Sequence, residues 1–280
     1  DHTHIEWTDA TWNPITGCTL VSEGCRHCYA ATLAATRLKN IPSRAGLARM
    51  NAAGEAKFTG EVRFNEQWLD QPLRWRKPRR IFVCAHSDLF HEAVPDEWID
   101  RIFAVMAGAQ RHTFQILTKR PERAAAYLPG LASRIYDAYG GMERFGDYHL
   151  DGIAHDTAEA WPLPNVWLGT SVEDQAAADA RIPYLLATPA AVRFVSAEPL
   201  LGPVSLDDMC DGTKFIDALR GNWWHDSDPP YIERGKPHLD WVIVGGESGP
   251  GARPMHPDWA RSLRDQCQSA GVAYFFKQWG

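Results

Sequence analysis

The chain has 280 residues, 45% of them hydrophobic, which suits one large or two smaller domains with a substantial buried core. No run approaches the roughly 18 apolar residues of a membrane span, and the amino end lacks the basic start and apolar centre of a signal peptide. We therefore expect a cytoplasmic protein that has no membrane partner. A net charge of −6 argues against an electrostatic grip on nucleic acid by the whole protein.

Three of the six cysteines gather near the amino end of the chain. Cys18, Cys25 and Cys28 stand in the segment GCTLVSEGCRHCYA, with six and then two residues between them. The remaining three, at positions 84, 210 and 267, are isolated in sequence, so the set does not form a disulfide framework. Three clustered thiols point to a metal or redox site.

A basic run follows at residues 74–80, where RWRKPRR carries five positive charges in seven residues. Such a run is typical of a solvated segment that leads into a strand. An edge that contacts phosphates or nucleic acid is the alternative.

From residue 80 onward, one pattern recurs: a short apolar run, a polar cluster directly after it and, in most cases, a segment of helical periodicity. Helices are predicted from Pro95, from about residue 175 to Leu186, and from about Pro257 to Ala270. Together with an opening strand near residues 4–7, the sheet has about seven strands. The six other strands are predicted at residues 80–85, 113–117, 165–169, 191–195, 241–244 and 272–276.

Apolar strands that alternate with helices indicate a parallel sheet covered on both faces. We expect a single α/β domain over residues 1–280, folded as a complete or partial (β/α) barrel of about six to seven parallel strands. A doubly wound open sheet is the alternative, and the barrel is favoured because polar groups follow every strand. Residues 129–163 and 204–238 lack the pattern and are predicted to be loop-rich insertions, acting as lids or as surface caps.

The polar residues after the strands are candidate site residues, because parallel strands end at one common edge. Ser87 and Asp88 follow the first strong strand and are expected to meet the amine or carboxylate of a bound cosubstrate. Alternatively, Asp88 caps a turn. Lys119 belongs to a basic cluster, TKR, that suits a carboxylate or phosphate, or a salt bridge to neighbouring acids. Thr170 and Ser171, with the acid at position 173, resemble a capping box, and ribose binding is the alternative.

Two acids and a glycine pair complete this set. Glu198 and Glu247 directly follow very apolar strands, where a carboxylate needs a donor such as a ribose hydroxyl or an amine. Gly245 and Gly246 open the segment GGESGPGARP, whose backbone amides can approach an anion. No residue is singled out as catalytic.

Three thiols suit some metal sites better than others. A structural zinc site usually has four ligands in two pairs, so zinc would need a further ligand such as His27. Iron–sulfur clusters usually take four cysteines, and a protein that supplies three leaves one iron open. An open iron can bind the amine and carboxylate of S-adenosylmethionine.

The cysteine segment GCTLVSEGCRHCYA, with an aromatic residue after its last cysteine, resembles the cluster loop of the radical S-adenosylmethionine superfamily, although the first gap is six residues where three is usual. IFVCAHSDLF and QILTKRP resemble two strands of the spore photoproduct lyase branch. The resemblance implies that Cys18, Cys25 and Cys28 bind a 4Fe-4S cluster. It also implies that Tyr29 lies against the adenine of S-adenosylmethionine, with ordinary packing of the ring as the alternative.

Further segments, including IEWTDATWNPITGC, SDLFHEAVPDEWI, WVIVGGESGPGARPMHP and FFKQWG, are similar to the phage- and prophage-associated three-cysteine family, along nearly the whole chain. This resemblance implies a partner protein named after the three-cysteine motif, but it specifies no reaction. The phage association favours a nucleotide or nucleic-acid substrate, by analogy. A radical enzyme also requires an electron donor.

Three functional hypotheses follow. The first is a radical S-adenosylmethionine enzyme that abstracts hydrogen from a substrate. The second is a non-catalytic, cluster- or zinc-containing nucleic-acid-binding module in which residues 74–80 contact phosphates, with steep salt dependence and no turnover. The third is a redox sensor that uses Cys25 and Cys28 as a dithiol, which leaves Cys18 unexplained.

Overall fold

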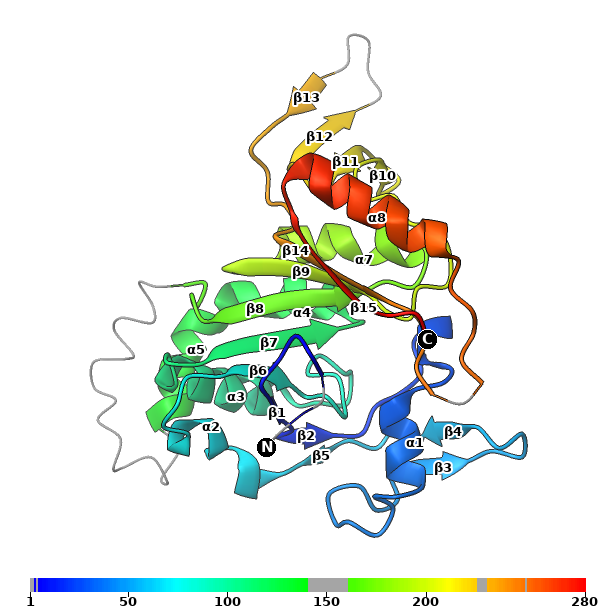
Figure 1. The fold of residues 1–280 in the computed structure, drawn as a ribbon. Coiled ribbons are helices and arrows are strands. Elements are labelled where there is room, and N and C mark those ends of the chain that lie inside the picture. The colour runs from blue at the N-terminus through cyan, green and yellow to red at the C-terminus, as the bar shows by residue number, and fades with distance from the viewer. Residues whose placement is uncertain (1–2, 4, 141–160, 226–230, 250) are drawn as a thin grey trace.

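A computed structural model describes residues 3, 5–140, 161–225, 231–249 and 251–280 (Figure 1). Its centre is a seven-stranded sheet in which all neighbouring strands are parallel and strand order follows chain order, β1-β6-β7-β8-β9-β14-β15. An order without reversal is that of a barrel wall, and it excludes the doubly wound alternative. The strands are β1 (Ala10–Trp12), β6 (Arg80–Val83), β7 (Thr113–Thr118), β8 (Val166–Ser171), β9 (Val192–Ala197), β14 (Trp241–Gly245) and β15 (Ala273–Gln278).

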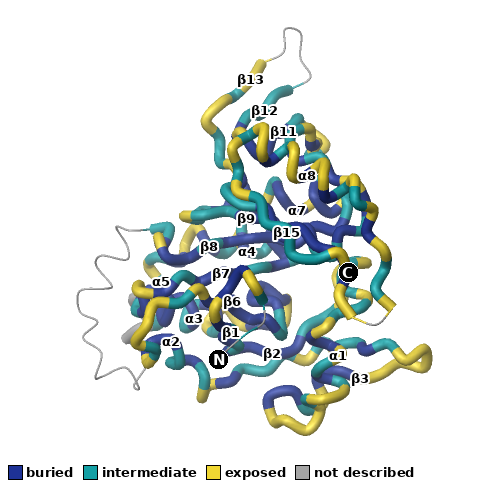
Figure 2. Tube along the Cα trace, in the orientation of Figure 1, coloured by how far each residue is buried: buried dark blue, intermediate teal, exposed yellow. Residues whose placement is uncertain are grey.

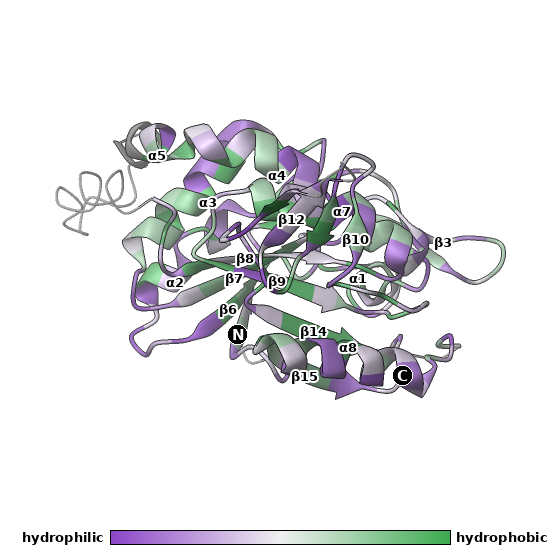
Figure 3. Cartoon of the chain, turned by 90° about the horizontal axis from the view of Figure 1, so that it is seen from above, coloured by the Kyte–Doolittle hydropathy of each residue, from purple (hydrophilic) through white to green (hydrophobic). Residues whose placement is uncertain are grey.

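The sheet forms a half-barrel, since β1 and β15 are edge strands that do not pair with each other in the described residues. This confirms the predicted partial (β/α) barrel. Strands in such a sheet are covered on both faces and therefore carry apolar residues continuously. Figure 3 shows this as hydrophobic stretches along β9 and β14.

Helices pack against the outer face of the sheet (Figure 1). In β6, for example, Ile81 and Val83 belong to the large core beneath the helices, whereas Phe82 points to the other face. The inner strands are largely dark blue in Figure 2, whereas the edge strand β15 is mostly teal and β13 and the turn after β3 are exposed. The longer helices are α3 (Asp96–Gly108), α5 (Leu131–Gly140), α7 (Gln175–Ala187) and α8 (Pro257–Ala270). Shorter helices are α1 (Tyr29–Ala35), α2 (Gln71–Arg74) and α4 (Pro121–Tyr127), with 3-10 turns η1 (Glu23–Cys25), η2 (Glu66–Trp68) and η3 (Leu128–Gly130).

Local sequence signals place two of these helices as predicted. Helix α3 follows Pro95 and carries Asp96 and Glu97 in its first turn, where acids interact favourably with the helix dipole. Helix α8 begins at Pro257 and ends before Gly271, whose φ of 73° is the left-handed conformation of a helix C-cap. No helix in the described ranges is both long and apolar enough to span a membrane.

The concave face of the half-barrel is filled by the amino-terminal segment. Trp7 is 4% exposed and packs on Phe82, Phe194 and Trp241, with ring centroids 4.9, 6.4 and 6.1 Å away. The strand predicted near residues 4–7 is therefore wrong: residue 4 lies outside the described ranges, residues 6–7 form a turn, and β1 begins at residue 10. The apolar side chains in this segment cover the sheet instead of extending it.

The two predicted insertions differ from loops. Residues 204–238 contain a four-stranded antiparallel sheet that projects beyond α8 (Figure 1). Its strands of two to four residues are too short to give a clear alternation in the sequence. In residues 129–163, α5 packs on α3, and residues 141–160 lie outside the described part. The projecting strands are β10 (Met209–Cys210), β11 (Phe215–Asp217), β12 (Asn222–His225) and β13 (Tyr231–Glu233).

Two small antiparallel pairs flank the cysteine segment. Strand β2 (Ile15–Thr16), just before the first cysteine, pairs with β5 (Arg63–Phe64). A hairpin of β3 (Ala48–Met50) and β4 (Ala56–Phe58) packs against α1, just after the last cysteine. The cysteine loop, residues 17–28, is thus attached at both ends to small sheets beside the half-barrel.

Candidate functional site

The three clustered cysteines line one cavity at the carboxyl ends of the strands. All three are free and half-buried, and the cavity has a volume of about 120 Å³. Its other walls include Asp88, which follows β6, Lys119 and Arg120, which follow β7, and Ser171, which ends β8. The buried thiol of Cys84 lines the same cavity. The structure therefore brings the cysteine loop and the ends of three strands together, as expected of a parallel sheet.

Burial controls the protonation of two of these thiols. It raises the pKa of Cys18 to about 12 and raises that of Cys28 as well. Both sulfurs are therefore neutral at pH 7 unless a cation compensates for burial, so metal binding would release protons. Among the residues described, no group of three or more His, Cys, Asp or Glu side chains has a geometry that could hold a metal ion.

The start of the cysteine loop is held by the turn after β6. Gly17 donates its backbone N–H to His86 O (3.2 Å), and the Ser87 hydroxyl donates to Ile15 O (2.9 Å). Gly17 has φ 97°, and a Cβ there would lie 2.1 Å from Glu61 O, so this close approach requires glycine. Ser87, predicted to contact a cofactor, thus has its hydroxyl engaged in positioning the loop.

Asp88 is buried and accepts hydrogen bonds at both carboxylate oxygens. Oδ1 accepts from Phe90 N (3.0 Å) and from the Thr118 hydroxyl (2.7 Å), and Oδ2 accepts from Lys119 N (3.0 Å) and Arg120 Nη1 (3.1 Å). The bond to Phe90 N is the turn cap that the sequence offered as an alternative. Asp88 therefore connects the end of β6 to the end of β7 and fixes the walls of the cavity.

Arg120 carries this network to the first cysteine. Its Nη1 lies 3.8 Å from Cys18 Sγ, its Nη2 donates to the Thr19 hydroxyl (2.5 Å), and its Nε donates to Glu92 (3.0 Å). Burial acts to lower the pKa of Arg120, and the charges of Asp88 and Glu92 outweigh it and raise the pKa. The guanidinium therefore stays charged beside the Cys18 sulfur.

Lys119 differs from its neighbour. It is half-buried, and in the part of the chain that is described its ammonium group makes no hydrogen bond or ion pair. Because its side chain lines the cavity, its charge is available to an anion there.

The far side of the cysteine loop is held by the loop after β14. Glu247 is 4% exposed and accepts from His27 Nδ1 (2.8 Å) and from Arg253 N (2.9 Å) and Nε (3.0 Å). Arg253 Nη2 also donates to Glu23 O (2.9 Å). Burial acts to raise the pKa of Glu247, but the Arg253 hydrogen bonds and charge prevail and bring it to about 2.

Glu173, which follows β8, contacts the same loop. Its carboxylate pairs with Arg181 in α7 (2.8 and 3.3 Å), and Oε2 lies 3.0 Å from where a Cβ of Gly24 would be. Burial acts to raise the pKa of Glu173, and the bonds to Arg181 hold it below its ordinary value. Residues 23, 24 and 27 of the loop are thus supported by the ends of β8 and β14.

The predicted capping box is wrong. The N-cap of α7 is Asp174, whose Oδ1 accepts from Ala177 N (2.8 Å). Glu173 faces Arg181 instead, and the buried Thr170 hydroxyl donates to Thr118 O (2.8 Å), linking β8 to β7. The helix therefore starts several residues after Thr170, which joins the sheet. Of Thr170, Ser171 and Glu173, only Ser171 lines the cysteine cavity.

The remaining predicted residues lie at the β9, β14 and β15 ends. Glu198 forms an ion pair with Lys277 across the sheet. A Cβ on Gly246 would lie 1.9 Å from Trp279 O, so this glycine permits the end of β15 to approach. Gly245 lies at a bulge in the β14–β15 register.

Tyr29 is not among the residues that line the cysteine cavity. Its hydroxyl donates to Ala85 O (2.6 Å), while its ring is 45% exposed and lines a separate cavity of about 630 Å³ together with His27 and Ser248. The structure places this ring next to the glycine-rich loop after β14. The expected contact with adenine stays a prediction.

The basic run at residues 74–80 lies elsewhere. It leads into β6, and thus sits at the amino ends of the strands, opposite the cavity. Arg80 pairs with Asp9 (3.1 Å), Arg74 pairs with Asp70 (3.0 Å), and Arg79 stacks over Trp75. The solvated lead-in to a strand is consistent with this position.

Sequence reasoning missed several residues that build the site. Arg253 and Arg181 pair with Glu247 and Glu173, and Cys84 has a φ of 58°, which is uncommon for a residue other than glycine. The sequence marked Arg120 as a member of the basic TKR cluster, but nothing in the sequence predicted its contact with Cys18. The position of Glu198 and Glu247 directly after apolar strands was the signal that cations would lie near, and they pair with Lys277 and Arg253.

Comparison with known proteins places the chain by family. No curated protein and no solved structure matches it. The family model described as "Protein of unknown function (DUF5131)" matches residues 2–280, so the chain belongs to this family.

Proposed function

We propose that this protein is a radical S-adenosylmethionine enzyme whose Cys18, Cys25 and Cys28 hold a 4Fe-4S cluster. The observation that carries the proposal is that these three thiols, from one loop, line one cavity at the carboxyl ends of a parallel half-barrel. Chemical sites of parallel α/β sheets lie at this edge.

The chemistry of the donor set suits the proposed group, although no three such side chains in the described residues are arranged to hold a single metal ion. Three sulfurs would ligate three irons and leave the fourth open, and deprotonated thiols are the ligands such clusters take. Such a cluster, with S-adenosylmethionine and an external electron donor, would supply one-electron cleavage of this cosubstrate and hydrogen abstraction from a substrate.

The chain's own residues then have separate tasks. Lys119 offers a free cation to the carboxylate of S-adenosylmethionine or to an anionic part of the substrate. Arg120 and Asp88 orient the loop at Cys18, and Glu247 orients it between Cys25 and Cys28 through His27. These anchors lie on three different strand ends, so they hold the loop on a rigid base.

The test begins with anaerobic purification, followed by iron and sulfide analysis and a visible spectrum. We expect about four irons and four sulfides per chain. After reduction with dithionite in the presence of S-adenosylmethionine, we expect 5′-deoxyadenosine. Cys25→Ala should lose both iron and product, whereas Cys210→Ala, which removes an exposed cysteine far from the cavity, should keep both.

Other outcomes would contradict the proposal. Stoichiometric zinc without iron, even after anaerobic reconstitution, would exclude it and leave the nucleic-acid-binding module as the better hypothesis. That module predicts binding to nucleic acid that falls steeply with salt concentration and no product from S-adenosylmethionine. The proposed protein partners, an electron donor and the three-cysteine-motif protein, would be sought by adding candidates to the same assay.

A further inference from the structure

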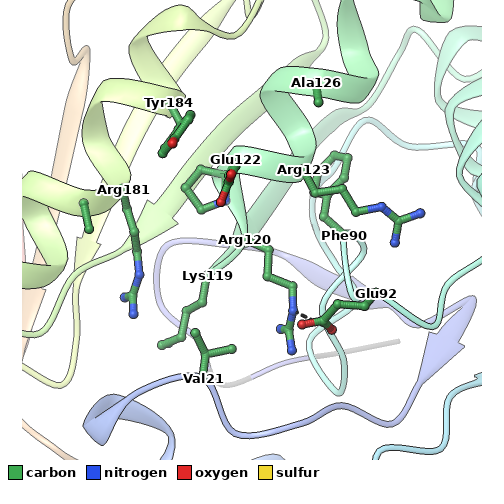
Figure 4. A pocket seen from close by; sticks show the side chains of 12 residues that line it. Val21, Phe90, Glu92, Lys119, Arg120, Glu122, Arg123, Ala126, Arg181 and Tyr184 are labelled. Carbon is green, nitrogen blue, oxygen red and sulfur yellow. Dashed lines mark hydrogen bonds and ion pairs between the residues drawn. The ribbon is translucent and has the colours of Figure 1, made fainter.

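A second, larger cavity adjoins the cysteine cavity. It has a volume of about 580 Å³ and lies between α4 and α7, with Val21 of the cysteine loop along one side (Figure 4). Val21, Lys119 and Arg120 line both cavities. A molecule bound in the larger cavity would therefore reach the wall of the cysteine site. The volume is in the range of sites for small molecules.

The charges around this cavity are mostly neutralised within the protein. Arg181 pairs with Glu173 (2.8 Å), Arg123 pairs with Asp96 (2.6 Å), and Arg120 pairs with Asp88 and Glu92. Within the described ranges, two charged groups have no ion-pair partner, the Lys119 ammonium at the inner end and the exposed Glu122 carboxylate on α4. The cavity thus offers one cation and one separate acceptor.

An exposed aromatic ring faces Glu122 across the cavity. Tyr184 on α7 is 42% exposed, and the ring and Glu122 come from facing helices (Figure 4). Val21 adds an apolar surface that is 40% exposed. A planar ligand could stack on Tyr184, where its edge would donate hydrogen bonds to a carboxylate.

We infer that this cavity binds a nucleotide, with its phosphate at Lys119 and its base on Tyr184 beside Glu122. The arrangement matches the three parts of the ligand, which are an anion, an aromatic face and an edge with N–H donors. Because it names the substrate class of the enzyme, the inference rests on the proposed function as far as turnover is concerned. Binding itself is testable without turnover.

The experiment is calorimetric titration of the anaerobically purified chain with the four deoxynucleoside 5′-monophosphates, the corresponding nucleosides and inorganic phosphate. At least one mononucleotide should bind, with its nucleoside about tenfold weaker. Lys119→Ala should remove that difference, and Tyr184→Ala should weaken nucleotide and nucleoside alike by about tenfold. Lys77→Ala and Tyr231→Ala change an exposed lysine and an exposed tyrosine on other surfaces and should leave binding unchanged.

Three results would overturn the inference. These are no binding of any mononucleotide, phosphate alone binding as tightly as the nucleotide, or loss of binding in Lys77→Ala with Lys119→Ala unaffected. S-adenosylhomocysteine provides a further arm, because a Lys119→Ala effect on that ligand alone would assign the lysine to the cosubstrate and reject the nucleotide site. Iron content and 5′-deoxyadenosine are measured on the same preparation, so failure of this inference is separable from failure of the proposed function.

Discussion

The carboxyl edge of the half-barrel and the concave face below it are built from the same strands but use opposite chemistry. The edge has buried carboxylates that pair with groups from other elements, as in Asp88 with Arg120 and Glu247 with His27. The concave face is filled by Trp7 and the aromatic rings around it. Of these two regions, only the edge combines a cavity with charged side chains in the described residues, and the cysteine loop lies there.

The strongest test of the charged edge is Asp88→Ala. The substitution removes four hydrogen bonds and the main counter-charge of a buried guanidinium, so we expect it to lower the free energy of unfolding by about 4 kcal/mol. Urea denaturation measures this. Asp265→Ala is the matched control, because Asp265 is an exposed acid paired with Arg264 and should change stability by less than about 0.5 kcal/mol. Equal effects in the two variants would show that the Asp88 network is not structural.

Trp7→Ala tests the concave face. Removing a side chain that is 4% exposed leaves a cavity among the rings of Phe82, Phe194 and Trp241, and we expect a loss of about 3 kcal/mol. Trp7→Phe keeps an aromatic ring and should lose about 1 kcal/mol. Both are measured by urea denaturation. If Trp7→Ala lowered the free energy of unfolding by less than Trp7→Phe does, the amino-terminal segment would not fill the concave face.

Sequence patterns predicted the features of the molecule that depend on the local order of residues. Six strands were located because apolar runs recur with polar residues directly after them, and the parallel arrangement placed Asp88, Lys119 and Ser171 at one edge. The cysteine set was visible from spacing alone. These features depend only on residues that are close together in the sequence.

Features that depend on contacts distant in sequence were not predicted. Arg253 meets Glu23 across 230 positions, and nothing in either local sequence identifies the other. Tryptophan is common in strands, so the local sequence suggested a strand at Trp7. Its burial on the concave face follows from the curvature of the sheet. Asp174 rather than Glu173 caps α7, and Glu173 instead pairs with Arg181, eight positions along the chain.

Glu247→Gln tests the second anchor of the loop through pH. The folded pKa of Glu247 is about 2, below the unfolded value of about 4.3, so the ionised carboxylate stabilises the fold above pH 4.3 and this contribution is lost as pH falls toward 2. At pH 7 we expect the variant to be about 2 kcal/mol less stable than the wild type. Urea denaturation from pH 7 to pH 3 should show the gap narrowing below about pH 5.

Comparison of the two curves isolates this group, because the other carboxylates titrate in both proteins. If the difference in free energy of unfolding between wild type and Glu247→Gln were constant from pH 7 to pH 3, Glu247 would have a packing role and no electrostatic one. A double variant with Arg253→Met provides a thermodynamic cycle, in which a coupling of about 1 kcal/mol or more is expected between the two side chains.

The smallest expected effect concerns Gly24, inside the cysteine loop. A Cβ on Gly24 would lie 3.0 Å from Glu173 Oε2, and Arg181 restrains that carboxylate through both oxygens, so Gly24→Ala should cost about 1 kcal/mol in urea denaturation. Gly202→Ala is the control, because its Cβ would meet Asp174 at an ordinary 3.4 Å. Iron content measured on both variants then tells whether the contact also positions Cys25, the next residue. If Gly24→Ala were as stable as the wild type and held as much iron, the segment between Cys18 and Cys25 would tolerate a shift at Gly24. Glu173 would then support the end of β8 and not the thiols.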